Sequence, residues 1–182
     1  MKFKQLDITG FKSFSEKTTI LIEEGLTGIV GPNGCGKSNI VESLRWCMGE
    51  NSAKSMRGSG MEDVIFAGTS NRPSKNISEV TLLLDNQNKE GPSHYKEFDE
   101  ISVRRKIEKD KGSKYYVNDK EVRARDVQTL FADLSTGAHS PSLISQGKIG
   151  QLVTAKPIER KSILEEAAGI SGIHARRQEA ET

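Results

Sequence analysis

Apolar side chains recur at every second position in several short stretches of this chain, a spacing typical of half-buried β-strands. They predict strands over residues 3–11, 18–22, 77–85, 101–107 and 115–117. A compact apolar run over residues 26–30 predicts a further strand, and a glycine-rich turn follows it. Gly112 lies between the strands expected over 101–107 and 115–117, so we expect these two to form a hairpin.

Elsewhere a helical spacing of apolar positions replaces this alternation and predicts amphipathic helices. One helix is expected over residues 40–48, directly after the glycine-rich turn. A second covers residues 127–134, and a third begins near Pro157, a residue suited to the first turn of a helix. Residues 50–76 are rich in serine, glycine and asparagine and predict a long loop with one short element. Together the strands and helices predict an α/β fold, with mixed β-sheets around the helix that follows the turn.

Composition excludes several classes of protein. The chain has 182 residues, of which 34% are hydrophobic and 29% charged, so it has the size of one domain with a large solvated surface. No apolar run reaches the roughly 18 residues of a transmembrane helix, and the first residues lack the apolar core of a signal peptide. Two cysteines, Cys35 and Cys47, are too few for a disulfide scaffold or a four-ligand zinc site, and they favour a reducing cytoplasm.

Charge is unevenly distributed along the chain. The net charge is +2, a value that does not by itself indicate a nucleic-acid partner. Residues 104–125, in contrast, contain nine basic and four acidic residues, a local charge of +5. Both a solvated hairpin and a surface that contacts the phosphates of nucleic acid are consistent with this segment.

The glycine-rich turn carries the clearest chemical signal. Residues 31–38 read Gly-Pro-Asn-Gly-Cys-Gly-Lys-Ser and match the phosphate-loop pattern G-x-x-x-x-G-K-[ST], between an expected strand and an expected helix. Glycine permits positive φ, so successive N–H groups can converge on one anion, and the N-terminus of the helix adds further donors. The motif predicts that Lys37 contacts the β- and γ-phosphates, that Ser38 binds Mg²⁺, and that Asn33 donates to the bridging or γ-phosphate oxygens.

Five further motifs surround the phosphate loop in a fixed order. They read Ile-Thr-Gly-Phe-Lys-Ser-Phe at residues 8–14, Ser-Ala-Lys-Ser-Met-Arg-Gly at 52–58, Met-Glu-Asp-Val-Ile-Phe-Ala-Gly at 61–68, Ile-Ser-Gln-Gly-Lys-Ile at 144–149 and Glu-Arg-Lys-Ser-Ile-Leu-Glu-Glu-Ala-Ala-Gly-Ile at 159–170. With the phosphate loop, this set closely resembles the N-terminal head segment of SMC (structural maintenance of chromosomes) proteins of the bacterial chromosome-segregation type. The resemblance covers essentially the whole chain.

The resemblance implies the N-terminal lobe of an ABC-type ATPase head over residues 1–172, followed by the start of a coiled-coil helix over residues 173–182. It implies ATP and Mg²⁺ as cofactors, and ATP-driven organisation of DNA in chromosome condensation and segregation. The implied partners are the C-terminal lobe of the same protein, a second SMC head in a homodimer, a kleisin-type subunit and DNA, with no membrane. The implied location is the cytoplasm, in association with the nucleoid.

The resemblance also assigns roles to individual residues. Lys12 resembles the family's basic residue near the phosphates and ribose, Arg57 its arginine finger, and Gln146 the Q-loop glutamine that contacts Mg²⁺ and the attacking water. Lys37, Arg57 and Gln146 are thus the expected catalytic residues, and Ser38 and Gln146 the expected Mg²⁺ ligands. The expected nucleotide-binding residues, of which the last three belong to the adenine-side wall, are Lys12, Pro32, Asn33, Gly34, Cys35, Gly36, Lys37, Ser38, Asn39, Asp63, Ile65 and Phe66. The expected DNA contacts are Lys120, Arg123 and Arg125.

Two features of an ABC-type ATPase are missing from this sequence. No apolar run ends in an Asp-Glu pair, and no Leu-Ser-Gly-Gly signature occurs. We therefore expect half of an active site, which does not turn over ATP by itself. Residues 138–145, which include His139, depart from a tyrosine-containing stretch expected in relatives, and the sequence assigns them no role.

Three other functions stay open on the sequence. A related RecF- or RecN-like repair ATPase differs mainly in having a shorter coil or none. A self-contained phosphate-loop kinase or small GTPase needs a second metal-binding aspartate and a base-reading motif, and neither is convincing here. A non-catalytic DNA-binding module would use the phosphate loop only structurally.

Overall fold

The computed structural model describes residues 1–89, 91–134, 143–144, 150 and 153–167. Gln146, His139 and the expected boundary between residues 172 and 173 lie outside the described residues, as does the expected start of the coiled coil. Within the described part, no helix is long and apolar enough to cross a lipid bilayer.

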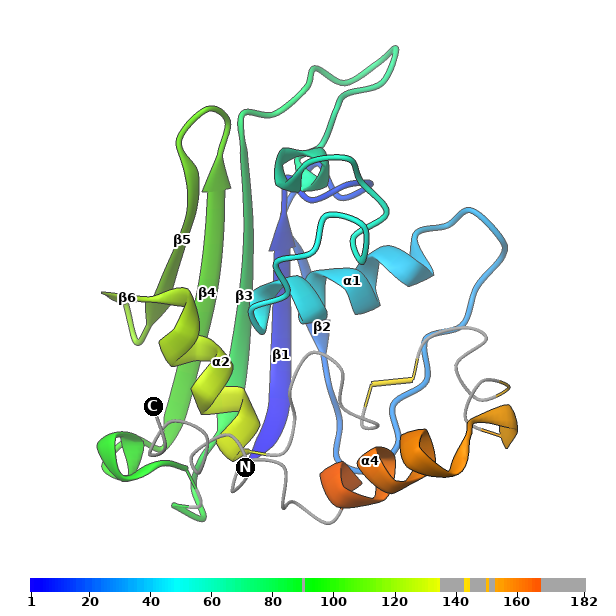
Figure 1. The fold of residues 1–182 in the computed structure, drawn as a ribbon. Helices are drawn as coiled ribbons and strands as arrows, with labels where there is room; N and C mark the ends of the chain where they lie inside the picture. Colours follow the sequence, from blue (N-terminus) through cyan, green and yellow to red (C-terminus); the bar gives the residue numbers. More distant parts are fainter. Residues whose placement is uncertain (90, 135–142, 145–149, 151–152, 168–182) are drawn as a thin grey trace.

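The described strands form one six-stranded antiparallel sheet with the spatial order β2-β1-β3-β4-β5-β6 (Figure 1). Its strands are β1 (Lys2–Thr9), β2 (Thr18–Leu21), β3 (Ile77–Asp85), β4 (Glu100–Glu108), β5 (Gly112–Val117) and β6 (Lys120–Val122). The predicted α/β class is confirmed, and β4 and β5 form the predicted hairpin. The described strands belong to one antiparallel sheet, however, and not to the mixed sheets that we expected, because every neighbouring pair runs antiparallel, including β1 and β3, which lie far apart in the sequence.

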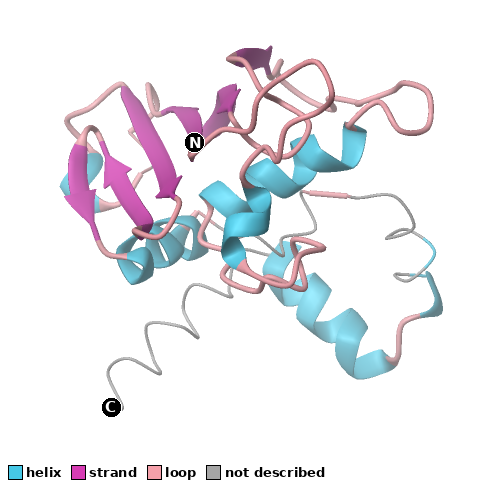
Figure 2. Cartoon of the chain, turned by 90° about the horizontal axis from the view of Figure 1, so that it is seen from above, coloured by secondary structure: helices cyan, strands magenta, loops and turns pink. Residues whose placement is uncertain are grey.

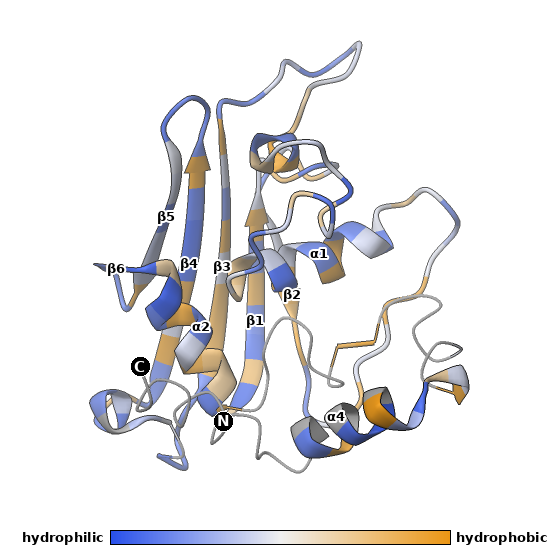
Figure 3. Ribbon diagram, in the orientation of Figure 1, coloured by the Kyte–Doolittle hydropathy of each residue, from blue (hydrophilic) through white to orange (hydrophobic). Residues whose placement is uncertain are grey.

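One face of the sheet is buried, and the other carries mainly polar residues. Hydrophobic and hydrophilic residues alternate along the strands (Figure 3), as the sequence predicted. The buried apolar residues of the three central strands are Leu6, Ile8, Val80, Leu82, Leu84, Ile101, Val103 and Ile107. Helices α1 (Lys37–Cys47) and α2 (Ala124–Asp133) cover this face (Figures 1 and 2) and pack the side chains of Trp46 and Phe131 into the core.

Three shorter or more peripheral elements complete the described structure. The 3₁₀ helix η1 (Met61–Val64) is the short element predicted within the long loop, and η2 (Ser93–Tyr95) precedes β4. Helix α4 (Pro157–Ala167) begins at the predicted proline and lies to one side of the sheet (Figure 1).

The predicted strand over residues 26–30 is wrong. These residues form an irregular segment between β2 and the phosphate loop, in which Leu26 and Val30 are 98% and 92% exposed. A strand is stabilised by hydrogen bonds to a neighbouring strand and by side-chain pairs across the two. No strand among the described residues pairs with this segment, so its apolar pattern alone is insufficient.

A charged residue lies within the core. Arg105 on β4 is 2% exposed, and the central carbon of its guanidinium lies 4.5 and 4.6 Å from the ring centroids of Trp46 and Tyr115. The guanidinium donates hydrogen bonds to the backbone oxygens of Trp46 and Glu50, at 2.8 and 2.7 Å. Cation–π contacts and carbonyl acceptors offset the lost hydration of a buried cation. Arg105 thereby fixes the C-terminal end of α1 on the sheet.

Candidate nucleotide site

The phosphate loop leads from the irregular segment into α1, and glycine conformation shapes its turn. Gly34 and Gly36 have φ of 83° and 95°, in the left-handed region that side chains disfavour. Gly36 is the N-cap of α1, and a Cβ on it would lie 2.9 Å from the hydroxyl oxygen of Ser13. A Cβ on Gly34 would meet nothing within 4 Å, so that side of the loop is open. An open loop of this kind, at the N-terminus of a helix, suits an anion, and phosphate binding here stays a prediction.

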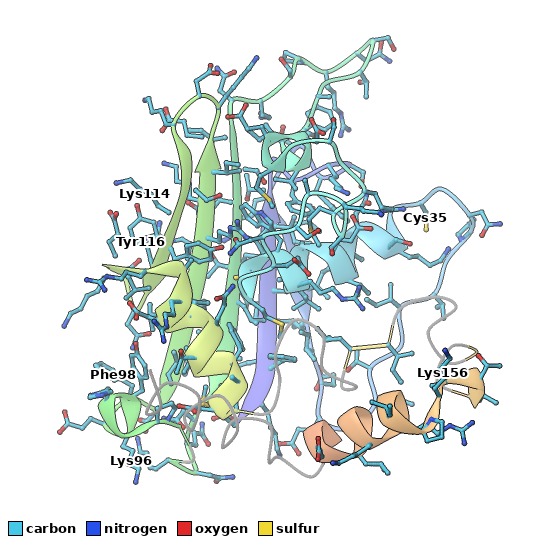
Figure 4. All side chains as sticks on the ribbon, viewed as in Figure 1. Cys35, Lys96, Phe98, Lys114, Tyr116 and Lys156 are labelled. Carbon is cyan, nitrogen blue, oxygen red and sulfur yellow. The ribbon has the colours of Figure 1, made fainter. Side chains whose placement is uncertain are left out.

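The side chain of Lys37 lies across the loop. Its ammonium donates hydrogen bonds to the backbone oxygens of Gly31 and Pro32, both at 2.6 Å, and lies 4.0 Å from the sulfur of Cys35. Cys35 is exposed beyond the N-terminal end of α1 (Figure 4). The ammonium is thus held over the turn that the sequence assigned to phosphate.

Ser38 supplies the one predicted Mg²⁺ ligand that the structure describes. It lies exposed in the first turn of α1. A hydroxyl oxygen is a hard ligand of the kind that Mg²⁺ accepts alongside phosphate and water oxygens, so this position fits a nucleotide-bound Mg²⁺ ion. The described residues contain no cluster of three or more His, Cys, Asp or Glu side chains that would bind a metal ion without a nucleotide.

Glu42, which sequence reasoning missed, joins two of the predicted residues. It lies on α1 with a side chain only 9% exposed, and its two carboxylate oxygens bind different loops. One oxygen accepts from the Lys12 ammonium at 2.5 Å, and the other lies 2.5 Å from Nε of Arg57. Lys12 also donates to the backbone oxygen of Met56. The spacing of four residues between Ser38 and Glu42, one helical turn, is the signal that could have indicated this residue.

Asn39 connects the same group to the phosphate loop. Its side-chain oxygen accepts a hydrogen bond from Arg57 at 2.8 Å, and its side-chain nitrogen donates to the Ser13 hydroxyl at 2.8 Å. Lys12 and Arg57 have φ of 46° and 53°, so both loops turn through the left-handed region at the residues that contact Glu42. The structure therefore brings Lys12, Asn39 and Arg57 together beside the phosphate loop. Their roles toward a nucleotide stay predictions.

The three residues of the expected adenine-side wall have structural contacts of their own. One carboxylate oxygen of Asp63 accepts the N–H groups of Ser59 and Gly60 and the Ser59 hydroxyl, at 2.7, 2.9 and 2.9 Å. The Gly60 N–H, followed by the Ser59 hydroxyl and N–H, lowers the pKa of Asp63, because each donor stabilises the carboxylate. Ile65 and Phe66 are only 8% and 6% exposed. Contact of these residues with a base stays a prediction.

Some basic residues of the segment over 104–125 form ion pairs with neighbouring carboxylates. Arg104 contacts Glu79 and Asp119, and Lys114 contacts Glu121 at 3.1 Å. Figure 4 shows Lys114 and Tyr116 on the outer side of β5. The residues predicted to bind DNA, Lys120, Arg123 and Arg125, are exposed on β6 and at the start of α2.

The fold and the loop together match a known family. A family model described as RecF/RecN/SMC N terminal domain matches residues 2–148, a range that includes the phosphate loop and Arg57. The chain belongs to this family. Two curated SMC relatives, each named chromosome partition protein Smc, are 59% identical (Cereibacter sphaeroides) and 56% identical (Rhodopseudomonas palustris) over 100% of this chain. The chain spans 16% of the length of each.

Solved SMC heads share the fold. An Smc head bound to the C-winged helix domain of ScpA is 31% identical, with a TM-score of 0.84 over 94% of this chain and 52% of that chain. A chain from a study of ATP-driven dimerization and DNA-stimulated activation of SMC ATPases is 30% identical, with a TM-score of 0.76 over 92% of this chain and 99% of that one. The resemblance to the N-terminal SMC head segment is thus confirmed, and these relatives give the RecF- or RecN-like alternative no better support.

Proposed function

We propose that this chain is the ATP-binding N-terminal half of an SMC head, which drives ATP-dependent DNA organisation and chromosome segregation in the complete protein. The observation that carries the proposal is Lys37, whose ammonium lies over an open, glycine-shaped turn at the N-terminus of α1. That turn binds the triphosphate of ATP through its N–H groups, and Lys37 moves from the loop carbonyls to the β- and γ-phosphates. The protein acts in the cytoplasm, in association with the nucleoid.

In the proposed reaction, hydrolysis of ATP to ADP and phosphate, each residue of the site has one task. Ser38 and Gln146 bind Mg²⁺, which when present neutralises charge on the phosphates. Arg57 stabilises the charge that develops on the transferred phosphoryl group, and Lys12 lies near the ribose and phosphates. Gln146 orients the attacking water, because an amide is too weak a base to remove its proton. The base of the nucleotide contacts the 63–66 stretch.

The proposed C-terminal lobe of the same protein completes the sheet and the active site. Support comes from Leu26 and Val30, which are 98% and 92% exposed in a segment rich in strand-forming residues. Ile158 and Leu164 on α4 are also 84% and 69% exposed. We infer that strands of this lobe pair with residues 26–30, and that the chain alone does not turn over ATP. Residues 1–172 then form the lobe of this chain, and residues 173–182 begin the coil.

The other proposed partners are a second SMC head, a kleisin-type subunit and DNA. ATP-driven dimerization is described for one solved SMC ATPase, and another Smc head is bound to ScpA. By similarity, two copies of the complete head dimerise on ATP, and a kleisin-type subunit binds them. The DNA contacts are Lys120, Arg123 and Arg125.

The substitution Lys37→Ala in the complete protein tests the ATP site. The substitution removes the ammonium that faces the phosphates, so we expect ATP affinity, measured by isothermal titration calorimetry, to fall at least about tenfold. The control is Lys17→Ala, which removes an exposed ammonium that contacts Asp7 and lies outside the loop. Unchanged ATP affinity in Lys37→Ala would favour the alternative function, a non-catalytic DNA-binding module in which the phosphate loop has only a structural role.

A further inference from the structure

One buried carboxylate, that of Glu42, forms ion pairs with two cations from two different loops. Lys12 belongs to the connection between β1 and β2, and Arg57 to the loop that follows α1. Both reach Glu42, whose oxygens lie 2.5 Å from Nζ of Lys12 and 2.5 Å from Nε of Arg57. We call these three residues and Asn39 the Glu42 cluster. The carboxylate offsets the repulsion between these two positive charges.

The charges of the cluster do not cancel. The three charged groups of the cluster sum to +1, of which the neighbouring Asp63 carboxylate, whose pKa is lowered by the Gly60 N–H and also by Lys12, offsets a part. Lys12 is only 13% exposed, whereas the Arg57 side chain is 58% exposed. Glu42 therefore holds the inner part of Arg57 through Nε and leaves much of the guanidinium accessible. An anion that binds at the N-terminus of α1 meets this excess positive charge.

The cluster is connected to the turn that shapes the phosphate loop. Arg57 donates to Asn39, and Asn39 donates to Ser13, both at 2.8 Å. The hydroxyl of Ser13 lies 2.9 Å from the position that a Cβ on Gly36 would occupy. Two hydrogen bonds thus link Arg57 to Asn39 in the first turn of α1 and, through Asn39, to Ser13.

From this geometry we propose that Glu42 is a positioning residue for nucleotide binding. Its carboxylate holds Lys12 and Arg57 at the phosphate end of α1, so that both cations are in place when the triphosphate arrives. The inference rests on the proposed function, because it assigns Glu42 a task toward the same nucleotide. If the ion pair only stabilised the fold, removal of the Glu42 charge would leave the affinity of the folded protein for MgATP unchanged.

The first measurement requires no nucleotide. Phenylglyoxal modifies accessible guanidinium groups, and mass spectrometry of the full-length protein reports the modification rate at Arg57. Glu42→Gln keeps the shape of the side chain and removes its charge, so Arg57 should react several-fold faster. Glu79→Gln, which removes a carboxylate that contacts Arg104 on the outer face of the sheet, is the matched control and should leave the Arg57 rate unchanged.

The second measurement is the affinity for MgATP. Glu42→Gln and Arg57→Ala should each weaken binding about tenfold, the effect of losing one charge-assisted contact. Because both variants remove the same positioned cation, the double variant should be no more than about threefold weaker than either single variant. Glu42→Asp keeps the charge on a shorter side chain, and an effect between those of the wild type and Glu42→Gln is expected in both measurements.

The outcomes separate the two proposals. Unchanged Arg57 reactivity in Glu42→Gln, tighter or unchanged MgATP binding, or an additive double variant would overturn the role of Glu42. If the wild type binds no ATP, the proposed function fails, and the reactivity of Arg57 alone decides whether Glu42 positions it. If Glu42→Gln does not fold, Glu42→Asp decides, and wild-type reactivity in that variant would overturn the role.

Discussion

The two cysteines have opposite surroundings. Cys35 is exposed on the phosphate loop. Cys47 is buried beneath the sheet, and its sulfur lies within hydrogen-bonding distance of the backbone oxygens of Val80 and Val103, at 3.5 and 3.3 Å. Burial raises the pKa of the Cys47 thiol from 9.0 to about 12, because a thiolate is poorly solvated there. Its proton therefore contributes stability below pH 9.0, and this contribution is lost as the pH rises toward 12.

This difference predicts which thiol reacts. In the native chain at pH 8, a maleimide should modify Cys35 and spare Cys47, since only the exposed thiol reaches the reagent. A bulky group on Cys35 should also weaken ATP binding in the complete protein, because Cys35 lies beside Lys37. Mass spectrometry and calorimetry give the two readouts, and Cys35→Ser, treated identically, is the control. The prediction would be contradicted if the maleimide modified both thiols of the folded chain. Full ATP affinity after complete modification of Cys35 would also contradict it.

Helix α1 is fixed at both ends, which makes it the element that connects the site to the core. At its N-terminal turn, the Glu42 cluster joins it to two loops. Past its C-terminal end, Arg105 binds the backbone oxygens of Trp46 and Glu50, and Gln128 on α2 donates to the Gly49 oxygen at 2.8 Å. Burial lowers the pKa of Arg105, but the aromatic rings and carbonyl oxygens around it favour the cation.

Neighbouring arginines on opposite faces of β4 provide a test of this anchor. Arg105→Met leaves buried carbonyl oxygens without a donor and should lower the free energy of unfolding by about 3 to 5 kcal/mol. Arg104→Met is the matched control, since Arg104 contacts exposed carboxylates, and should cost less than about 1 kcal/mol. Urea denaturation followed by circular dichroism measures both. Equal losses from the two variants would show that Arg105 does not anchor α1.

At the scale of the whole molecule, the exposed apolar segment over residues 26–30 and the exposed basic residues near 120–125 lie on different elements. The exposed apolar segment precedes the phosphate loop, whereas the exposed basic residues lie at β6 and the start of α2. Much of the remaining basic charge on the sheet is paired with carboxylates, as for Arg104 and Lys114. We therefore expect an anionic polymer to bind near residues 120–125, where Lys120, Arg123 and Arg125 are exposed.

Replacing Lys120, Arg123 and Arg125 with glutamate tests this surface in the complete protein. Three lost phosphate contacts should weaken DNA binding and reduce the slope of log K against log salt by about 2.7. The same change at Lys17, Lys89 and Lys96, which are exposed in other connections of the chain, controls for net charge. Fluorescence anisotropy at several salt concentrations measures the slope. An unaltered slope in the first variant, or an equal change in both, would contradict the assignment.

Sequence patterns predicted features that depend on local spacing and missed those that depend on distant partners. The alternation over 77–85 predicted β3, because each residue's face is fixed by its neighbours in sequence. The run over 26–30 is also rich in strand-forming residues but has no pairing strand among the described residues. Arg105 was counted with a basic surface segment, although Trp46 and Tyr115 enclose it. Glu42 lies outside the phosphate-loop motif, and only the fold places it between Lys12 and Arg57.

The contact of Lys37 with its own loop has a consequence for how affinity is interpreted. Its ammonium already has two oxygen ligands, from Gly31 and Pro32, each at 2.6 Å. To bind a phosphate oxygen, the Lys37 ammonium must therefore give up a hydrogen bond to a backbone oxygen. The net gain is the difference between the two environments, so a moderate dissociation constant is compatible with a strong individual bond. When no nucleotide is bound, the Lys37 ammonium thus stabilises the turn through its own backbone oxygens.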